Sequence, residues 1–194
     1  TVLDNLATQR YASLWQTPRP APPFHFVEGD ILDTDLAALC TGQDACVHLA
    51  ARTDAAGSIG QEAAYYETNV TGTQRVAEAC LTHKVPLIFL STTSVYGPQT
   101  GTVDESLPWE QYNPQTPYAD SKHAAEHILT THFGPRGLRF ITLRCGTIFG
   151  PSPGMRFHTF VNKACWQAAM GQPITLWREA QGALVAREEH VRTA

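Results

Sequence analysis

The sequence predicts an α/β fold built on a parallel sheet. Short apolar, β-rich segments alternate along the chain with longer amphipathic segments of helical periodicity. The apolar segments lack the alternation of a strand with one solvated face, which favours strands covered by helices on both faces. Ligands of such sheets bind beyond the carboxyl ends of the strands. In this sequence those ends carry Asp4, Asp30, "LAA", "STTS" and "RCGT".

Five strands are expected from these apolar segments. The first ends at Asp4, the second at Asp30, and the third spans residues 45–51. The fourth, residues 86–97, has the clearest pattern, because a β-rich apolar run stops at a cluster of hydroxyl side chains. The fifth, residues 138–150, has the same form. Helices are expected at residues 33–41, 59–83, 117–133 and 157–170.

Composition and charge narrow the class of protein. The 194 residues suffice for one well-packed domain, and the net charge of -4 without a basic run argues against a nucleic-acid partner. No apolar run approaches the roughly 20 residues that span a bilayer, and the first residues lack a signal-peptide pattern. We therefore expect a cytoplasmic protein. Its five cysteines, odd in number and without a C-x-x-C pair, predict buried reduced thiols: Cys40, Cys46, Cys80, Cys145 and Cys165.

Two chemical signatures overlap in "PYADSKHAAEHIL", residues 117–129. Tyr118 and Lys122 form Y-x-x-x-K, and H-x-x-E-H, the pattern of inverted zinc peptidases, begins at His123. On a helix, Tyr118 and Lys122 share a stripe with apolar residues, whereas His123 and His127 lie nearly opposite and are expected to face solvent. The sequence indicates no further zinc ligand, so no metal is expected. By itself, Y-x-x-x-K describes only a half-buried tyrosine beside a lysine.

Seven motifs occur in order along residues 1–176: "VLDNL", "GDI", "HLAA", "ETNVTGTQRVAEAC", "FLSTTSVYG", "PYADSK" and "LRCGTIFGP". Their order and spacing resemble the extended short-chain dehydrogenase/reductases, the NAD-dependent epimerase/dehydratase family, with a layout closest to UDP-glucose 4-epimerases. The resemblance implies a Rossmann-type doubly wound sheet, NAD as cofactor and a nucleotide-sugar substrate. It also implies a homodimer of the parent protein, paired through the helices at residues 59–83 and 117–133.

The resemblance implies that Tyr118 is the catalytic acid/base, which takes a proton from a sugar hydroxyl as the hydride passes to the nicotinamide. A free tyrosine has a pKa near 10, and the ammonium of Lys122 one turn later favours its phenolate. In the family this lysine also binds the nicotinamide ribose. Thr92 matches a hydroxyl that binds the reacting group, although it could simply cap a strand end. Ser94 and Thr147 complete the implied substrate contacts.

The cofactor contacts also follow from the resemblance. A carboxylate at Asp4 would accept hydrogen bonds from the adenine ribose and repel a 2′-phosphate, which favours NAD over NADP. Without the resemblance, Asp4 is an ordinary turn residue. Asn69 is expected to brace the small-residue turn, with a buried, satisfied amide as its alternative. The other implied contacts, besides Tyr118 and Lys122, are Asn5, Asp30, Ile31, Leu49, Ala50, Ala51, Ser91 and Cys145.

The chain departs from the family pattern at both ends. The family's first strand and its G-x-x-G-x-x-G turn, which binds the pyrophosphate, should precede "VLDNL". "GSIG", residues 57–60, follows a later strand and does not replace them. We therefore expect an incomplete NAD-binding domain at residues 1–150, weak cofactor binding by the chain, and the start of a substrate-binding region at residues 151–194. Arg187 lies in a stretch that does not follow the family pattern.

The expected function is NAD-dependent epimerisation of a nucleotide sugar. A dehydratase of this family would carry an Asp-Glu pair where Thr93 and Ser94 stand, which weakens that alternative. The same fold also suits a dehydrogenase or reductase of a different substrate. A fourth possibility is a catalytically inactive binding module.

Overall fold

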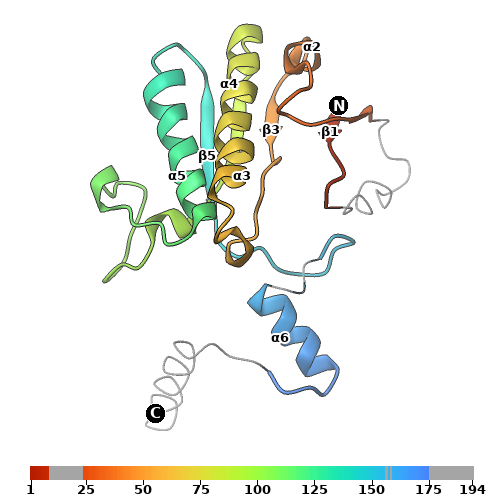
Figure 1. Cartoon of the computed structure of the whole chain (residues 1–194), viewed down its shortest axis with the longest axis vertical. Helices are drawn as coiled ribbons and strands as arrows, with labels where there is room; N and C mark the ends of the chain where they lie inside the picture. The colour runs from red at the N-terminus through yellow and green to blue at the C-terminus, as the bar shows by residue number, and fades with distance from the viewer. Residues whose placement is uncertain (9–23, 156, 158, 175–194) are drawn as a thin grey trace. The chain divides into compact units, whose positions relative to one another are not determined.

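The computed structural model describes residues 1–8, 24–155, 157 and 159–174. The described residues fall into two compact units, of which the first ends at Gly146 and the second starts at Thr147. All five expected strands are present in the first unit (Figure 1). They are β1 (Val2–Asp4), β2 (Phe26–Glu28), β3 (Cys46–His48), β4 (Leu87–Thr92) and β5 (Phe140–Cys145).

The strands are parallel, as expected, but they form two sheets. In the first, β1 pairs with β2. In the second, β4 is the central strand between β3 and β5. Cys46 lies opposite Leu87, and Thr92 lies opposite Cys145. Because the pairings are parallel, the carboxyl ends of the strands in each sheet share one edge, so Thr92 and Cys145 are neighbours there.

The helices match the expected positions with small differences in length. The expected helix at residues 59–83 begins later, and its three segments follow one another without a break: α3 (Glu62–Tyr66), η2 (Glu67–Thr71) and α4 (Gly72–His83). Thr116 caps the next helix by accepting a hydrogen bond from Ala119, and Pro117 takes its first position. This helix comprises α5 (Pro117–Ile128) and η5 (Leu129–Phe133). The remaining helices are α2 (Leu36–Cys40), α6 (Phe160–Ala169) of the second unit, and the short η1 (Ala56–Ser58), η3 (Thr93–Tyr96) and η4 (Trp109–Gln111).

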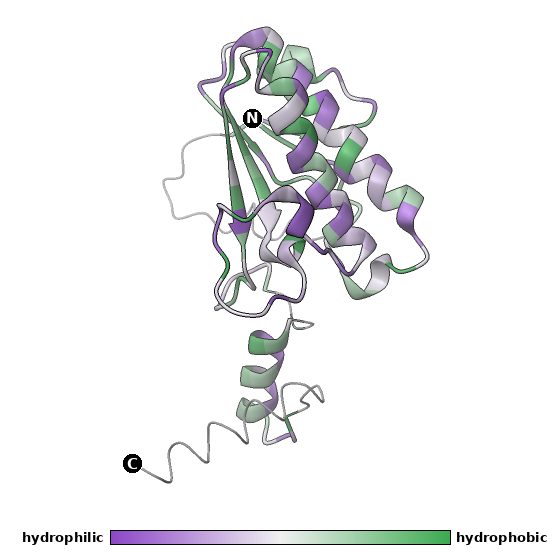
Figure 2. Ribbon diagram, turned by 90° about the vertical axis from the view of Figure 1, so that its left-hand side faces the viewer, coloured by the Kyte–Doolittle hydropathy of each residue, from purple (hydrophilic) through white to green (hydrophobic). Residues whose placement is uncertain are grey.

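The hydrophobic core lies between the strands and the helices of the first unit. Leu87 and Phe89 of β4 are fully buried in it, together with residues of α2, α4, α5 and η5. Figure 2 shows these helices on one side of the strands. The opposite face of the three-stranded sheet is bare among the described residues, and its exposed side chains are Val47, Leu49, Ile141 and Leu143. Within the described residues of the first unit the expectation of cover on both faces is therefore wrong, because α2, α4, α5 and η5 all pack on the same face.

Within the described parts of the chain, no helix has the length and apolar character needed to cross a membrane.

Candidate active site

Lys122 is anchored beside the carboxyl end of β4. It is 4% exposed, and its Nζ donates a 2.9 Å hydrogen bond to the carbonyl of Leu90, two residues before Thr92. The ammonium also lies 4.7 Å from the centre of the Phe89 ring, a cation–π contact. The burial of Lys122, Ala125 and Leu129 confirms that this stripe of α5 faces the core. Tyr118, one turn before Lys122, is half-buried.

Serine hydroxyls fix the backbone of Tyr118. Its N–H donates to Ser58 Oγ at 3.2 Å, and its carbonyl accepts from Ser121 Oγ at 2.8 Å. Ser121 also accepts from Asn69 Nδ2, whose amide bonds both the N–H and the carbonyl of Arg52. Asn69 therefore braces the turn after β3 and links it to α5. Sequence patterns did not indicate Ser58 or Ser121, because Ser58 meets Tyr118 across 60 residues and Ser121 meets Asn69 across 52 residues.

Carboxylates gather at the ends of β1 and β2. Asn5 Nδ2 donates to Asp30 Oδ2 at 2.7 Å, and Asp4 Oδ1 accepts from the N–H of Leu6 at 2.6 Å. Leu6 has φ of 55°, so the backbone turns sharply directly after the strand. The structure thus brings Asp4, Asn5 and Asp30 together, as the sequence predicted for strand ends of one sheet.

The remaining residues that were predicted to contact the cofactor differ in how far their side chains are exposed. Leu49 is 60% exposed after β3, followed by the half-buried Ala50 and Ala51. Ile31 is buried in the core, which leaves its backbone for any ligand contact. Ser91 is 5% exposed, and its buried hydroxyl has no hydrogen-bond partner among the described residues.

The predicted substrate hydroxyls lie at the end of β4. Thr92 Oγ1 donates to Ser94 Oγ and accepts from the N–H of Ser94, both at 3.1 Å, so it caps η3. Capping was the alternative to a substrate contact for Thr92. A capping hydroxyl can still contact a ligand, and the neighbouring Ser94 is exposed. Thr147 is exposed and is the first described residue of the second unit. Arg187 lies outside the described residues.

Burial controls the charges around Lys122. It lowers the pKa of Lys122 to about 8, against the opposing effect of the Glu126 carboxylate. His48 is 4% exposed, and its Nε2 lies 3.0 Å from Thr73 Oγ1. Burial, with the charge of Lys122 in second place, lowers the pKa of His48 to about 3. At neutral pH the imidazole is therefore uncharged, and the lysine is predominantly an ammonium.

The depressed pKa of Lys122 predicts a stability that rises with pH. Between about 8 and the unfolded value near 10.4, the unfolded chain binds a proton that the folded chain lacks. Unfolding then takes up a proton, so the free energy of unfolding grows by up to about 1.4 kcal/mol per pH unit. Replacing Lys122 with Met removes this contribution.

The measurement is urea unfolding of both proteins by circular dichroism from pH 7.5 to 10.5. The difference in stability, wild type minus Lys122→Met, should rise steadily across this range. Lys163→Met, at an exposed position of α6, is the control for the loss of a lysine. A constant difference for Lys122→Met would mean that the lysine titrates normally in the folded protein.

A buried ion pair also holds α5, the helix that carries Lys122. Glu126 is 2% exposed, and three hydrogen bonds of 2.7–3.2 Å join its carboxylate to the guanidinium of Arg144 in β5. Arg144 also donates to Tyr96 Oη at 2.9 Å and lies against the rings of Tyr96 and Tyr112, 4.9 Å from each centre. Although burial opposes the charged form, the bonds to Glu126 and Tyr96 raise the pKa of Arg144. The network ties α5 to β5 and to the segment that follows β4.

The expectation that both histidines of H-x-x-E-H face solvent is wrong for His123. Its ring packs 5.1 Å from the rings of Tyr112 and Trp109, and burial lowers its pKa. His127 is exposed, as expected. Glu126 is held by Arg144, and the described residues contain no group of three potential ligands placed to hold a metal ion. The motif therefore belongs to a packed aromatic cluster.

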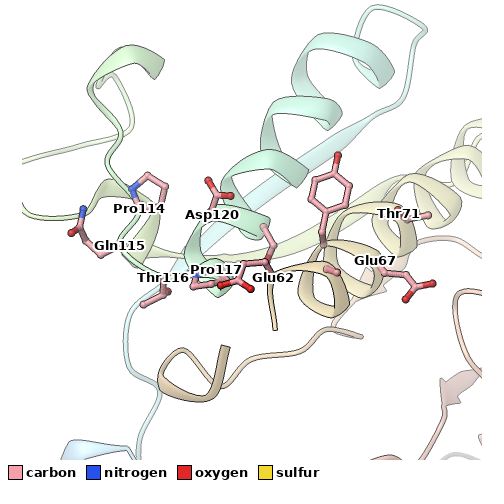
Figure 3. Close-up of a pocket in the computed structure, with 11 residues that line it drawn as sticks. Glu62, Glu67, Thr71, Pro114, Gln115, Thr116, Pro117 and Asp120 are labelled. Atoms are coloured by element: carbon pink, nitrogen blue, oxygen red, sulfur yellow. The ribbon is translucent and has the colours of Figure 1, made fainter. Parts of the chain in front are cut away.

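A cavity of about 760 Å³ lies between α3, η2 and the start of α5 (Figure 3). Glu62, Glu67 and Asp120 give it an acidic lining. None of the predicted catalytic or cofactor residues lines this cavity. It is therefore a feature of the helical face, separate from the carboxyl edge of the strands.

The parallel strands and the helices packed on them form an α/β fold of the Rossmann type. Residues 1–188 match the model of the NAD dependent epimerase/dehydratase family, and the chain belongs to this family.

Individual relatives and solved structures that resemble this chain act on nucleotide sugars, according to their names. The chain is 32% identical to an uncharacterised UDP-glucose epimerase of Bacillus subtilis over 166 residues, 84% of this chain and 50% of the relative. It is 37% identical to a dTDP-glucose 4,6-dehydratase of Streptomyces niveus over 131 residues, 66% of this chain and 38% of the relative. The structure of UDP-glucuronic acid 4-epimerase from Bacillus cereus with UDP-glucuronic acid and NAD superposes with a TM-score of 0.74 at 30% identity, covering 90% of this chain and 56% of that one. The chain thus spans about half the length of these relatives, or less.

Proposed function

We propose that the protein is an NAD-dependent epimerase of a nucleotide sugar. The observation that carries this proposal is the position of Tyr118 and Lys122 on α5, which Lys122 anchors beside the hydroxyls of Thr92 and Ser94. The ammonium of Lys122 favours the phenolate of Tyr118, which takes the proton of a sugar hydroxyl and later returns it. Thr92 and Ser94 would orient that hydroxyl, and Thr147 is a further proposed substrate contact.

The residues at the strand ends fit NAD. When bound, this cofactor would accept a hydride from the sugar carbon and return it to the other face. Asp4 and Asp30 present acceptors for ribose hydroxyls and the adenine, and Ser91 offers its unpaired hydroxyl. Lys122 would donate to the nicotinamide ribose. The other proposed contacts are Asn5, Leu49, Ala50, Ala51, Cys145 and the backbone of Ile31, with Asn69 holding the turn.

Epimerisation is favoured over dehydration by the residues next to Thr92. Loss of water from a sugar requires an acid for the departing hydroxyl and a base for the carbon-bound proton. Thr93 and Ser94 occupy the positions beside Thr92 at the end of β4, and neither side chain ionises near neutral pH. Similarity to the Streptomyces dehydratase therefore supports the shared first step, hydride removal, more than the later elimination.

The direct test incubates the full-length gene product separately with UDP-glucose, UDP-glucuronic acid and dTDP-glucose. Proton NMR should show a C4 epimer of one of the UDP sugars, without stoichiometric accumulation of NADH. A 4-keto-6-deoxy product from dTDP-glucose would replace the proposal with dehydration. Stoichiometric NADH would identify a dehydrogenase, and cofactor binding with no conversion would identify a binding module.

Replacing Asp4 with Asn should weaken NAD binding about tenfold and reduce the preference over NADP. Asn keeps an oxygen for the Leu6 N–H but loses the charge that strengthens hydrogen bonds to ribose and repels a 2′-phosphate. Calorimetric titration of the full-length gene product with each cofactor measures both effects. Asp44→Asn, at an exposed turn before β3, is the matched control. If Asp4→Asn still preferred NAD over NADP as strongly as Asp44→Asn does, this role for Asp4 would be refuted.

We further propose that the second unit begins the substrate-binding region, residues 151–194, and that the protein acts in the cytoplasm as a homodimer. The outer surfaces of the segments at residues 59–83 and 117–133 would supply the contact. The cavity bordered by α3 and α5 lies on this helical face. Sedimentation velocity of the full-length gene product would test the pairing, with a concentration-independent monomer as the contrary result.

A further inference from the structure

The short helix η3 carries Ser94, and its last residue, Tyr96, is bonded to another strand. Tyr96 is only 8% exposed, although its side chain ends in a hydroxyl. Its Oη accepts a 2.9 Å hydrogen bond from Nη1 of Arg144 in β5. The proposed function assigns no role to Tyr96, which stands two residues after Ser94 in the chain.

Arg144 bonds Tyr96 and the helix of Lys122 at the same time. While Nη1 bonds Tyr96, Nε and Nη2 donate to the carboxylate of Glu126 at 2.7–3.2 Å. Glu126 lies one turn after Lys122 on α5. The side chains of Arg144 and Glu126 are 14% and 3% exposed, so water competes little for these bonds. Because a guanidinium is planar and rigid, Arg144 fixes η3 relative to α5.

The other contacts of Tyr96 hold it less firmly against β5 and α5. Its carbonyl accepts from the N–H of Asn113 at 3.3 Å and from Nε2 of Gln99 at 2.8 Å, and its ring stacks on Tyr112. These three residues belong to the segment that follows η3 and can shift together with it. Ring contacts also tolerate small displacements, whereas a hydrogen bond weakens steeply as its angle changes. The bond to Arg144 is therefore the contact that sets the direction of η3.

We propose that Tyr96 is a positioning residue, which holds Ser94 against the Tyr118–Lys122 pair through its bond to Arg144. This inference rests on the proposed function, in which Thr92 and Ser94 orient the sugar hydroxyl. Thr92 Oγ1 donates to Ser94 Oγ at 3.1 Å, so a shift of Ser94 disturbs both hydroxyls. Displacement of a positioning group by about 1 Å can slow a reaction by about 10²-fold. Loss of the bond from Arg144 should lower kcat and leave KM nearly unchanged.

The test replaces Tyr96 with Phe in the full-length gene product. Proton NMR follows the initial rate of the product that the wild type forms from a nucleotide sugar. We expect kcat to fall about tenfold, with KM for the sugar within about twofold of the wild type. Phe keeps the ring on Tyr112, and the three bonds between Arg144 and Glu126 remain. An unchanged kcat, or a change in KM alone, would overturn the proposal.

A second variant distinguishes the positioning of Ser94 from a loss of packing. Ser94→Ala removes the hydroxyl but keeps the backbone N–H that Thr92 caps. In this background Tyr96→Phe should have little further effect on kcat, because the hydroxyl that Tyr96 positions is gone. A tenfold effect in both backgrounds would overturn the proposal.

Tyr65→Phe is the matched control for the loss of a buried tyrosine hydroxyl. Tyr65 is 4% exposed, and its Oη donates a 2.7 Å hydrogen bond to the carbonyl of Asp54, away from η3 in the chain. Its effect on kcat should be the same with and without Ser94→Ala, because it does not act through Ser94. If Tyr65→Phe depended on Ser94 as strongly as Tyr96→Phe does, the proposal would fail.

Thiol reactivity shows whether the variants keep their native packing. Cys40 and Cys80 are buried, whereas Cys165 is exposed, which corrects the expectation that all five thiols are buried. In Tyr96→Phe, a maleimide should react with Cys165 while Cys40 and Cys80 stay protected. Reaction at all three would assign the lost rate to unfolding and overturn the proposal.

The wild type separates this inference from the function on which it rests. If the wild type converts none of UDP-glucose, UDP-glucuronic acid and dTDP-glucose, the proposed function fails and this inference fails with it. If the wild type is active and Tyr96→Phe is equally active, the inference alone fails.

Discussion

Replacing Arg144 with Met is expected to destabilise the first unit by about 3–5 kcal/mol. The substitution leaves the Glu126 carboxylate 2% exposed without the three hydrogen bonds that it receives from the guanidinium. It also removes the cation that contacts the rings of Tyr96 and Tyr112. Urea unfolding measures the loss, and the fluorescence of Trp109 is a local probe because its ring packs against Tyr112.

An exposed ion pair of the same unit provides the matched control. Arg136 donates two hydrogen bonds of 2.8 Å to Glu78, with side chains 39% and 51% exposed. Arg136→Met should therefore cost far less than Arg144→Met. Combining Arg144→Met with Glu126→Leu should recover most of the loss, because an apolar pair removes the buried charge. Equal effects at Arg144 and Arg136 would show that burial does not determine the value of the pair.

The elements of the fold could be predicted because they depend on local patterns. Each expected strand is a short apolar run, and all five are present, as is the buried stripe of α5. The division into two sheets could not be predicted, because pairing depends on contacts between distant segments. The bare sheet face has the same origin. Val47 and Ile141 are as apolar as buried strand residues, but the described helices of the first unit pack on the other face of the sheet.

The site shows the same division between local and distant information. Motif order placed Asp4, Asp30 and the Tyr118–Lys122 pair, but it could not show the carboxylate–guanidinium pair that supports α5. The error at His123 arose because a helical wheel ignores the segment that folds over it. Gly97, with φ of 65°, lets that segment return, since a Cβ there would overlap the carbonyl of Asn113. Tyr112 and Trp109 are then carried onto His123.

Replacing Tyr118 with Phe should lower turnover by the full-length gene product by a factor of about 10² to 10⁴. Phe keeps the ring but lacks the hydroxyl proposed to carry the proton of the sugar. The bonds that hold this residue in the helix, to Ser58 and Ser121, use its backbone and survive the substitution. The rate constant should therefore fall while the protein stays folded, which circular dichroism of both proteins measures.

A second tyrosine, Tyr66, is the control that distinguishes a loss of catalysis from a general effect of replacing tyrosine with phenylalanine. Tyr66 lies on the helical face at 53% exposure, and Tyr66→Phe should leave the rate unchanged. Turnover by Tyr118→Phe within tenfold of the wild type would assign the proton transfer to another group. Lys122→Met offers a further discrimination, because it removes the charge that favours the phenolate but keeps the hydroxyl. If Tyr118 is the base, raising the pH should restore part of the activity of Lys122→Met and none of that lost in Tyr118→Phe, since only the former retains a group that can ionise.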